Sequence, residues 1–166
     1  SAQITLLTTP PFEQFAKACP WFDRVETDGR PKDASGTTSL IRRLRSAKYD
    51  IIYDFQNSGR TGNYFQALRP NPPLWSGAAP GAAFQHDTEH RSQMHSIERL
   101  AEQLTIAGIG PTEGYSYADM PRADFSWIEP ALRNAPRLTP AFFSLKGPFA
   151  LLIPGSSAHR TAKRWP

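Results

Sequence analysis

The chain has 166 residues, of which 39% are apolar and 11% aromatic, enough for one packed domain and too few for two complete ones. Its net charge of +4 is too small and too dispersed to indicate duplex-DNA binding, and it suits a small phosphorylated or nucleotide ligand. The one cysteine, Cys19, excludes an internal disulfide, and no apolar run has the length of about 18 residues that a membrane span needs.

Strands and helices alternate from the start of the chain. The β-branched run 4–8 predicts a strand, and residues 12–18 predict a helix after a break at Pro10 and Pro11. That helix would place three apolar side chains on one face, namely Phe12, Phe15 and Ala16. Residues 24–27 predict a second strand.

The next helix is predicted over residues 39–48, with Thr37 or Thr38 as its cap. Its apolar face would consist of Leu40, Ile41 and Leu44, and its arginines would point outward. The run YDIIYDFQ, residues 49–56, then predicts a strand that is buried on both faces, as strands of parallel sheets are.

The alternation continues through the middle of the chain. A glycine-containing turn leads into a predicted helix that carries Tyr64, Phe65 and Leu68. Residues 74–77 predict a short strand, and residues 78–92, which are polar and rich in Gly, Ala and His, predict a loop. The clearest helix covers 94–107, with apolar residues at helical spacing: Ile97, Leu100, Ala101 and Leu104.

Residues 110–148 are rich in proline and predict irregular structure, with one helix around 127–133, and 149–153 predict a closing strand. Strands that alternate with helices indicate an α/β fold with a mainly parallel sheet. The sequence therefore predicts an N-terminal domain over 1–109, an interdomain region over 110–148 and the start of a second domain at 149–166.

The closing stretch LLIPGSSAHRTAKRWP has the form of a strand that runs into a phosphate-binding loop. Gly155 permits close approach of an anion, the hydroxyls of Ser156 and Ser157 can donate hydrogen bonds to phosphate oxygens, and Lys163 supplies a compact positive charge. The Walker A pattern is absent, and by pattern alone an ordinary turn is the better interpretation of Pro-Gly-Ser-Ser. The A-K-R-W-P that follows makes the phosphate-binding interpretation more specific.

Polar residues also follow the strand predicted at 49–56, in the stretch DFQNSGRTG. Gln56, Asn57 and Arg60 would lie at the carboxyl end of that strand, where open α/β sheets bind ligands, and an arginine there can grip a phosphate or carboxylate with two hydrogen bonds. The alternative is a turn in which Asn57 or Ser58 caps the following helix.

His95 stands near the start of the strongest predicted helix, in the stretch HRSQMHSIER. A neutral imidazole at this position can hydrogen-bond a hydroxyl or a phosphate, or it can serve the helix end alone. The other histidines, including His86 and His90, lack metal-ligand spacing with it, so the sequence predicts neither a metal site nor a cofactor.

The order of these stretches resembles glycosyltransferase family 9, the heptosyltransferases of lipopolysaccharide core synthesis. The resemblance rests on YDIIYDFQ followed by SGRT, on the helix opening M-H-x-x-E-R that ends A-G-I, and on LLIPGSS with K-R-W-P. It covers residues 3–109 and 149–166, whereas 110–148 match only loosely.

The resemblance implies a GT-B fold, in which two Rossmann-like domains face each other across a cleft. Residues 1–109 would belong to the acceptor domain, with Gln56, Asn57, Arg60 and His95 on the acceptor side. Gly155, Ser156, Ser157 and Lys163 would contact the donor diphosphate. The implied reaction is metal-independent and inverting, and it transfers heptose from ADP-heptose to a lipid-linked, phosphorylated core saccharide at the inner face of the cytoplasmic membrane.

The sequence departs from the family pattern at both ends and in one loop. The family opens with a strand and a Gly-Asp loop whose aspartate is the proposed base, and that unit is expected upstream of Ser1. Most of the donor domain is expected after Pro166. The chain thus resembles an internal piece that would not turn over alone, and the insertion of residues 159–162 before Lys163 shifts the register of the serines.

Two other functions are compatible with the residues. A noncatalytic α/β module could bind a phosphorylated ligand or a protein partner through the same serine and lysine loop, without a base. Nucleic-acid binding through the basic groups would require a steep salt dependence, and the few aromatic residues beside basic ones give it little support.

Overall fold

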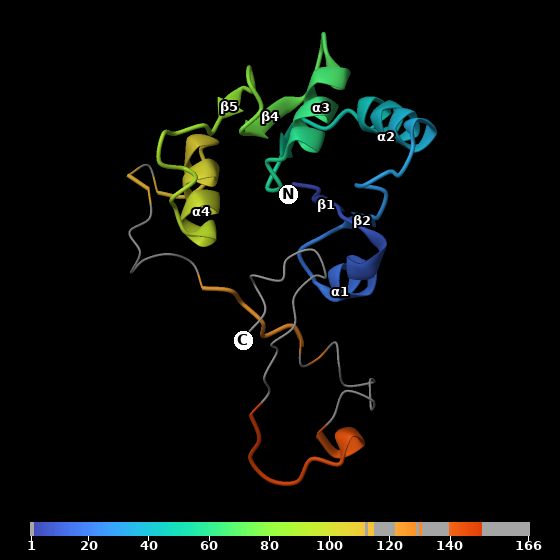
Figure 1. The fold of residues 1–166 in the computed structure, drawn as a ribbon, viewed down its shortest axis with the longest axis vertical. Helices are drawn as coiled ribbons and strands as arrows, with labels where there is room; N and C mark the ends of the chain where they lie inside the picture. Colours follow the sequence, from blue (N-terminus) through green and yellow to red (C-terminus); the bar gives the residue numbers. More distant parts are fainter. Residues whose placement is uncertain (1, 112, 115–121, 129, 131–139, 151–166) are drawn as a thin grey trace. The chain divides into compact units, whose positions relative to one another are not determined.

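The structure is a computed structural model that describes residues 2–111, 113–114, 122–128, 130 and 140–150 (Figure 1). The chain divides into two compact units, residues 1–124 and 125–166. In the second unit the described residues include a 3-10 helix, Pro140–Phe143, in which the rings of Phe142 and Phe143 meet edge to face at 5.1 Å. Most of the helix predicted at 127–133 and of the strand predicted at 149–153 lies outside the described residues.

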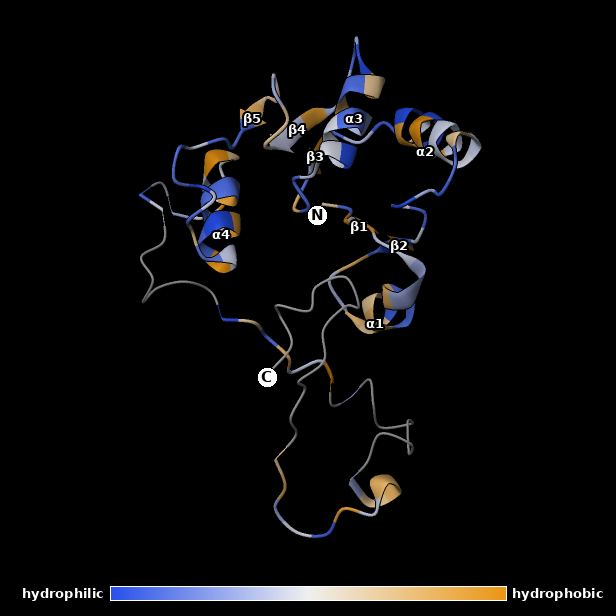
Figure 2. Ribbon diagram, in the orientation of Figure 1, coloured by the Kyte–Doolittle hydropathy of each residue, from blue (hydrophilic) through white to orange (hydrophobic). Residues whose placement is uncertain are grey.

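The first unit is an α/β structure with two small parallel sheets and flanking helices, which confirms the predicted fold class at this level. One sheet pairs β1 with β2, and the other has the order β3-β4-β5 (Figures 1 and 2). The elements in chain order are β1 (Thr5–Leu7), the 3-10 turn η1 (Pro10–Phe12), α1 (Glu13–Ala18), β2 (Arg24–Glu26), α2 (Ala34–Ser46), β3 (Ile51–Tyr53), α3 (Gly59–Leu68), β4 (Leu74–Gly77), β5 (Phe84–Gln85) and α4 (Ser96–Ile106).

Helix α2 begins earlier than predicted. Asp33 is its N-cap, with Oδ1 accepting a hydrogen bond from the Gly36 amide at 2.7 Å, so the predicted caps were wrong. Thr37 and Thr38 lie inside the helix, and their hydroxyls donate to the backbone carbonyls of Asp33 and Ala34.

The prediction that the arginines of α2 all point outward is wrong for Arg43. Its guanidinium is half-buried and contacts two carboxylates. Glu26 is the last residue of β2, and Asp28 lies in the loop that follows it. Burial lowers the pKa of Arg43, and interaction with Tyr49 opposes this shift. The pairing fastens α2 to the end of β2.

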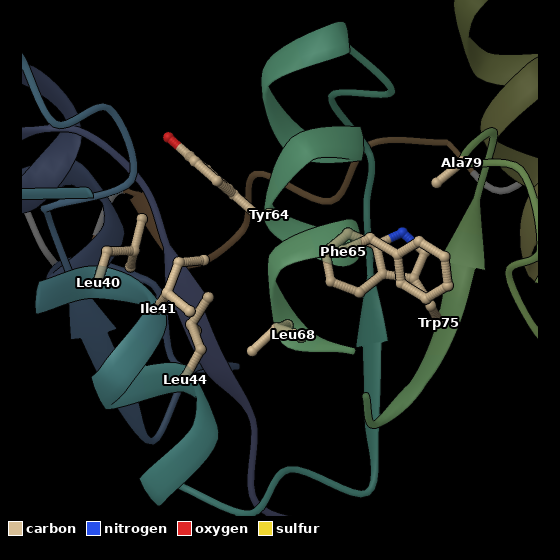
Figure 3. Packing of buried hydrophobic residues seen from close by; sticks show 8 residues of the cluster. All are labelled: Leu40, Ile41, Leu44, Tyr64, Phe65, Leu68, Trp75 and Ala79. Carbon is tan, nitrogen blue, oxygen red and sulfur yellow. The ribbon is translucent and has the colours of Figure 1, made fainter. Parts of the chain in front are cut away.

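The main core lies between α2, α3 and β4, and the apolar faces predicted for both helices are confirmed (Figure 3). The rings of Phe65 and Trp75 pack at a centroid distance of 5.3 Å, tilted by 48°. Each fully buried Leu or Phe side chain contributes about 1.5–3 kcal/mol. The buried members are Leu40, Ile41, Leu44, Tyr64, Phe65, Leu68, Trp75 and Ala79.

Four further expectations are corrected. The strand predicted at 49–56 is shorter, and its residues are only partly buried. Residues 78–92 contain strand β5 as well as loop. On the first helix only Ala16 is buried, while Phe12 and Phe15 remain more than half exposed. Helix α4 starts at Ser96, after the predicted Met94.

Helix α4 buries an unexpected side chain. Of the apolar residues predicted to face inward, Ala101 is buried, but Ile97 is 51% exposed. Gln103, by contrast, is completely buried. Figure 2 shows hydrophilic and hydrophobic residues interspersed along α4. Polar contacts therefore contribute much of what holds this helix against the β3-β4-β5 sheet.

Candidate functional site

The loop after β3 is shaped by a buried carboxylate. Asp54 is 7% exposed, and its Oδ1 accepts hydrogen bonds from the backbone amides of Gln56 at 3.0 Å and Asn57 at 2.9 Å. An aspartate that binds the amides that follow it forms a tight turn. Asn57 adopts a φ of 48°, the left-handed conformation that asparagine tolerates better than most residues.

Asn57 is held on both sides of its amide. Its Oδ1 accepts a hydrogen bond from the Ala78 amide at 2.6 Å, and its Nδ2 donates to Gln103 Oε1 at 2.7 Å. Gln103 Nε2 in turn donates to the carbonyl oxygens of Asp54 and Ser76, each at 3.1 Å. These contacts join the carboxyl ends of β3 and β4 to α4, so Asn57 organises the site rather than offering a free amide to a ligand.

Arg30 joins the predicted residues at this edge. The Gln56 amide lies against the Arg30 guanidinium, and with the amide turned so that its oxygen faces Arg30, that oxygen accepts hydrogen bonds from Nε at 3.3 Å and from Nη2. Arg60 stands in the first turn of α3. We call Arg30, Gln56 and Arg60 the two-arginine cluster.

Tyr64 links the two arginines to the core. Its hydroxyl donates to the Gly29 carbonyl at 3.3 Å, which ties the loop of Arg30 to α3. Burial raises the pKa of Tyr64, and the positive charges of Arg60 and Arg30 act in the opposite direction. Both guanidinium groups are therefore close enough to the phenol to influence its charge.

The N-terminus of α3 adds to the positive character of the cluster. Ser58 caps the helix by accepting from the Thr61 amide at 3.3 Å, while Thr61 Oγ1 accepts from the Ser58 amide at 3.0 Å. Arg60 projects from this same turn, where the helix dipole favours an anion. Two guanidinium groups beside a helix N-terminus can bind a phosphate or a carboxylate. This is the chemistry that the arrangement supports.

His95 is used by its own helix. It is the N-cap of α4, where Nδ1 accepts from the Ile97 amide at 3.3 Å and Glu98 Oε2 accepts from the His95 amide at 3.0 Å. The imidazole is exposed. Among the contacts within the described residues, none joins His95 to Gln56 or Arg60, so its place in an acceptor site stays a prediction.

Sequence reasoning missed three residues near this edge. Arg30 lies in a loop with no motif of its own, Gln103 occupies a helix face expected to be apolar, and His86 lies in a segment predicted as loop. His86 is completely buried after β5, with Nε2 at 3.4 Å from Glu102 Oε2 on α4. Gln56, Asn57 and Arg60 were predicted because they stand together in the stretch DFQNSGRTG.

The predicted donor-phosphate residues Gly155, Ser156, Ser157 and Lys163 lie outside the described residues. In the described part of the chain, no group of three or more His, Cys, Asp or Glu side chains is placed to hold a metal ion. Nor does that part contain a helix with the length and apolar character needed to cross a bilayer. Comparisons with protein-family models, with curated proteins and with solved structures gave no match.

Proposed function

We propose that this chain contributes the acceptor-binding half of a metal-independent glycosyltransferase of the heptosyltransferase type, with a Rossmann-like domain of a GT-B fold. The observation that carries the proposal is the two-arginine cluster at the carboxyl end of β3. It supplies, at the edge where α/β sheets bind ligands, the cationic groups that a phosphorylated saccharide requires. The sequence resemblance supplies the reaction class.

In this proposal Arg30 and Arg60 hold an acidic group of the acceptor, and Gln56 fixes the Arg30 guanidinium. The acceptor hydroxyl oxygen attacks the anomeric carbon of ADP-heptose and loses its proton to a base. The bond between that carbon and the diphosphate oxygen breaks, and ADP leaves. Ser156, Ser157 and Lys163 would stabilise the negative charge that develops on the diphosphate.

The experiment that tests the proposed function is a calorimetric titration of ADP into the gene's full-length product and into its Lys163→Ala variant, with UDP as the nucleotide control. We expect saturable ADP binding that is weaker in the variant, because an ammonium–phosphate contact is lost. Binding of a sugar phosphate without any ADP binding to the folded protein would contradict the transferase and favour the noncatalytic module.

A further inference from the structure

A pocket lies at the amino ends of β3 and β4, at the opposite end of these strands from the two-arginine cluster. Tyr49 and Pro73, which line it, come just ahead of β3 and β4, whereas Gln56 follows β3. The pocket has a volume of about 510 Å³, which is within the range of about 300–1,000 Å³ that small-molecule sites occupy. We call it the amino-end pocket.

Part of the pocket wall is apolar and rigid. Leu44 of α2 and Leu68 of α3 are buried, and both point into the space between the two helices (Figure 3). Pro70, Pro72 and Pro73 also line the pocket. Because proline has no side-chain freedom to lose, a flat apolar group that packs against these rings meets a surface that is already formed.

The same pocket is positively charged. Three cations line it, and none of its described lining residues is acidic: Arg45, Lys48 and Arg69. In the part of the chain that the structure describes, none of these three forms an ion pair. Helices α2 and α3 both end here, and because each helix C-terminus carries about half a negative charge, a net excess of about two positive charges remains. A phosphate monoester carries about −1.5 to −2 at neutral pH, which matches this excess.

Two of the cations are held in place. Arg45 Nη2 donates to the carbonyl oxygens of Ala67 at 2.5 Å and Arg69 at 3.4 Å. A guanidinium has five N–H donors, and the described contacts of Arg45 use only those of Nη2, so Nε and Nη1 remain for an anion. The Arg69 guanidinium lies over the Phe65 ring, 5.6 Å from its centroid. Ordering both groups beforehand reduces the entropy that ligand binding costs.

Lys48 occupies a position that usually holds glycine. It follows Ala47, the C-cap of α2, and its φ is 52°. This left-handed conformation favours glycine at the end of a helix. A lysine here costs conformational free energy, and what it adds is an ammonium group at the amino-end pocket.

We infer that the amino-end pocket binds a small aryl phosphate, that is, a phosphate monoester carried by an aromatic ring. The phosphate oxygens accept hydrogen bonds from Arg45 and Lys48, and the ring packs against Tyr49 and the prolines. Inorganic phosphate would meet the cations alone, and a neutral aromatic molecule would meet the apolar wall alone. The pocket therefore selects a ligand that has both parts. The inference does not depend on the proposed function.

A calorimetric titration of phenyl phosphate into the gene's full-length product tests this inference, with inorganic phosphate and phenol as control ligands. The protein carries Arg30→Gln and Arg60→Gln throughout, so that binding at the two-arginine cluster is not mistaken for binding at the pocket. Arg45→Gln and Lys48→Gly are compared in this background. Arg42→Gln is the matched control, because Arg42 is exposed on α2 and does not line the pocket.

We expect phenyl phosphate to bind about tenfold or more tightly than inorganic phosphate, because its ring also buries apolar surface, and phenol not to bind. Arg45→Gln and Lys48→Gly should each weaken binding about fivefold or more, and Arg42→Gln should leave it unchanged. Arg45→Gln also removes hydrogen bonds to α3, so Lys48→Gly is the deciding variant. Its melting temperature should be unchanged or higher, since glycine suits a φ of 52°.

Three results would overturn the inference. Phenyl phosphate could fail to bind the folded protein. Inorganic phosphate could bind as tightly as phenyl phosphate, which would leave the apolar wall without a role. Lys48→Gly could weaken binding no more than Arg42→Gln, which would mean that the ligand is attracted by net charge or bound elsewhere.

Discussion

Gln103→Leu should destabilise the first unit and loosen the loop of the candidate site together. Gln103 is fully buried and makes three hydrogen bonds, to the carbonyls of Asp54 and Ser76 and to the amide of Asn57. Leucine fills a similar volume without replacing any of them. The substitution therefore removes polar contacts and leaves packing nearly unchanged.

The magnitude follows from the groups left without a partner. Ser76 O keeps its hydrogen bond from the Asp54 amide at 2.8 Å, whereas the structure shows no other partner for Asp54 O among the described contacts. A hydrogen bond contributes about 1 kcal/mol net, and an unsatisfied buried group costs about 1–3 kcal/mol. Three lost bonds thus predict a loss of about 2–4 kcal/mol, a large part of a typical domain stability of about 5–15 kcal/mol.

The assay is urea unfolding followed by circular dichroism, with Gln93→Leu as the control because Gln93 is exposed just before α4. Hydrogen exchange of the Gln56 and Asn57 amides in the same variants reports on the loop. A loss below about 0.5 kcal/mol, equal to that of the control, is the range of ordinary surface changes and would refute the reasoning.

Three further predictions follow from local geometry. Arg60→Gln should raise the pKa of Tyr64, because it removes a positive charge that lowers it; phenolate absorbance against a Tyr64→Phe blank measures this, and an unchanged titration would contradict the cluster. Because burial raises the pKa of Tyr64 in the folded protein, the free energy of unfolding should fall as the pH rises from about 10, the unfolded value, through the folded value. Gly77→Ala should lower the melting temperature, because a Cβ there would lie 2.9 Å from the Asn57 side-chain oxygen. Gly62→Ala meets nothing within 4 Å and should leave the melting temperature unchanged or raise it; equal effects of the two substitutions would contradict the close packing of Asn57 against Gly77. Asp33→Ala should lower the free energy of unfolding in urea by about 1 kcal/mol, because the N-cap of α2 is lost; an unchanged free energy would mean that Asp33 does not cap the helix.

Much of the first unit could be predicted from local sequence pattern. The apolar spacing of α2 and α3 identified the core residues, because a helix buries one face regardless of what it packs against. The turn after β3 was recognisable because aspartate, asparagine and glycine favour such turns for local reasons. Strand β5 was not predicted because its two residues are too few to show an alternating apolar pattern.

The contacts that build the site depend on tertiary structure and had no local signal. Gln103 is buried because two strand ends place carbonyl oxygens opposite it, a circumstance that helical periodicity cannot reveal. Arg43 faces inward because Glu26 and Asp28 lie beneath α2. Arg30 joins Gln56 across 26 sequence positions, which no motif spacing encodes.

The central claim is that the two-arginine cluster binds a phosphorylated saccharide. The most direct measurement is a calorimetric titration of glucose 6-phosphate, with glucose as the neutral control, into the chain and its Arg30→Gln, Arg60→Gln and Arg42→Gln variants. Arg42 is exposed on α2 and matches the charge change outside the cluster. The account predicts binding of the phosphate ester alone, weakened about tenfold or more by either cluster substitution and unchanged in Arg42→Gln. Equal weakening in all three variants would mean that only net charge matters, and it would contradict the site.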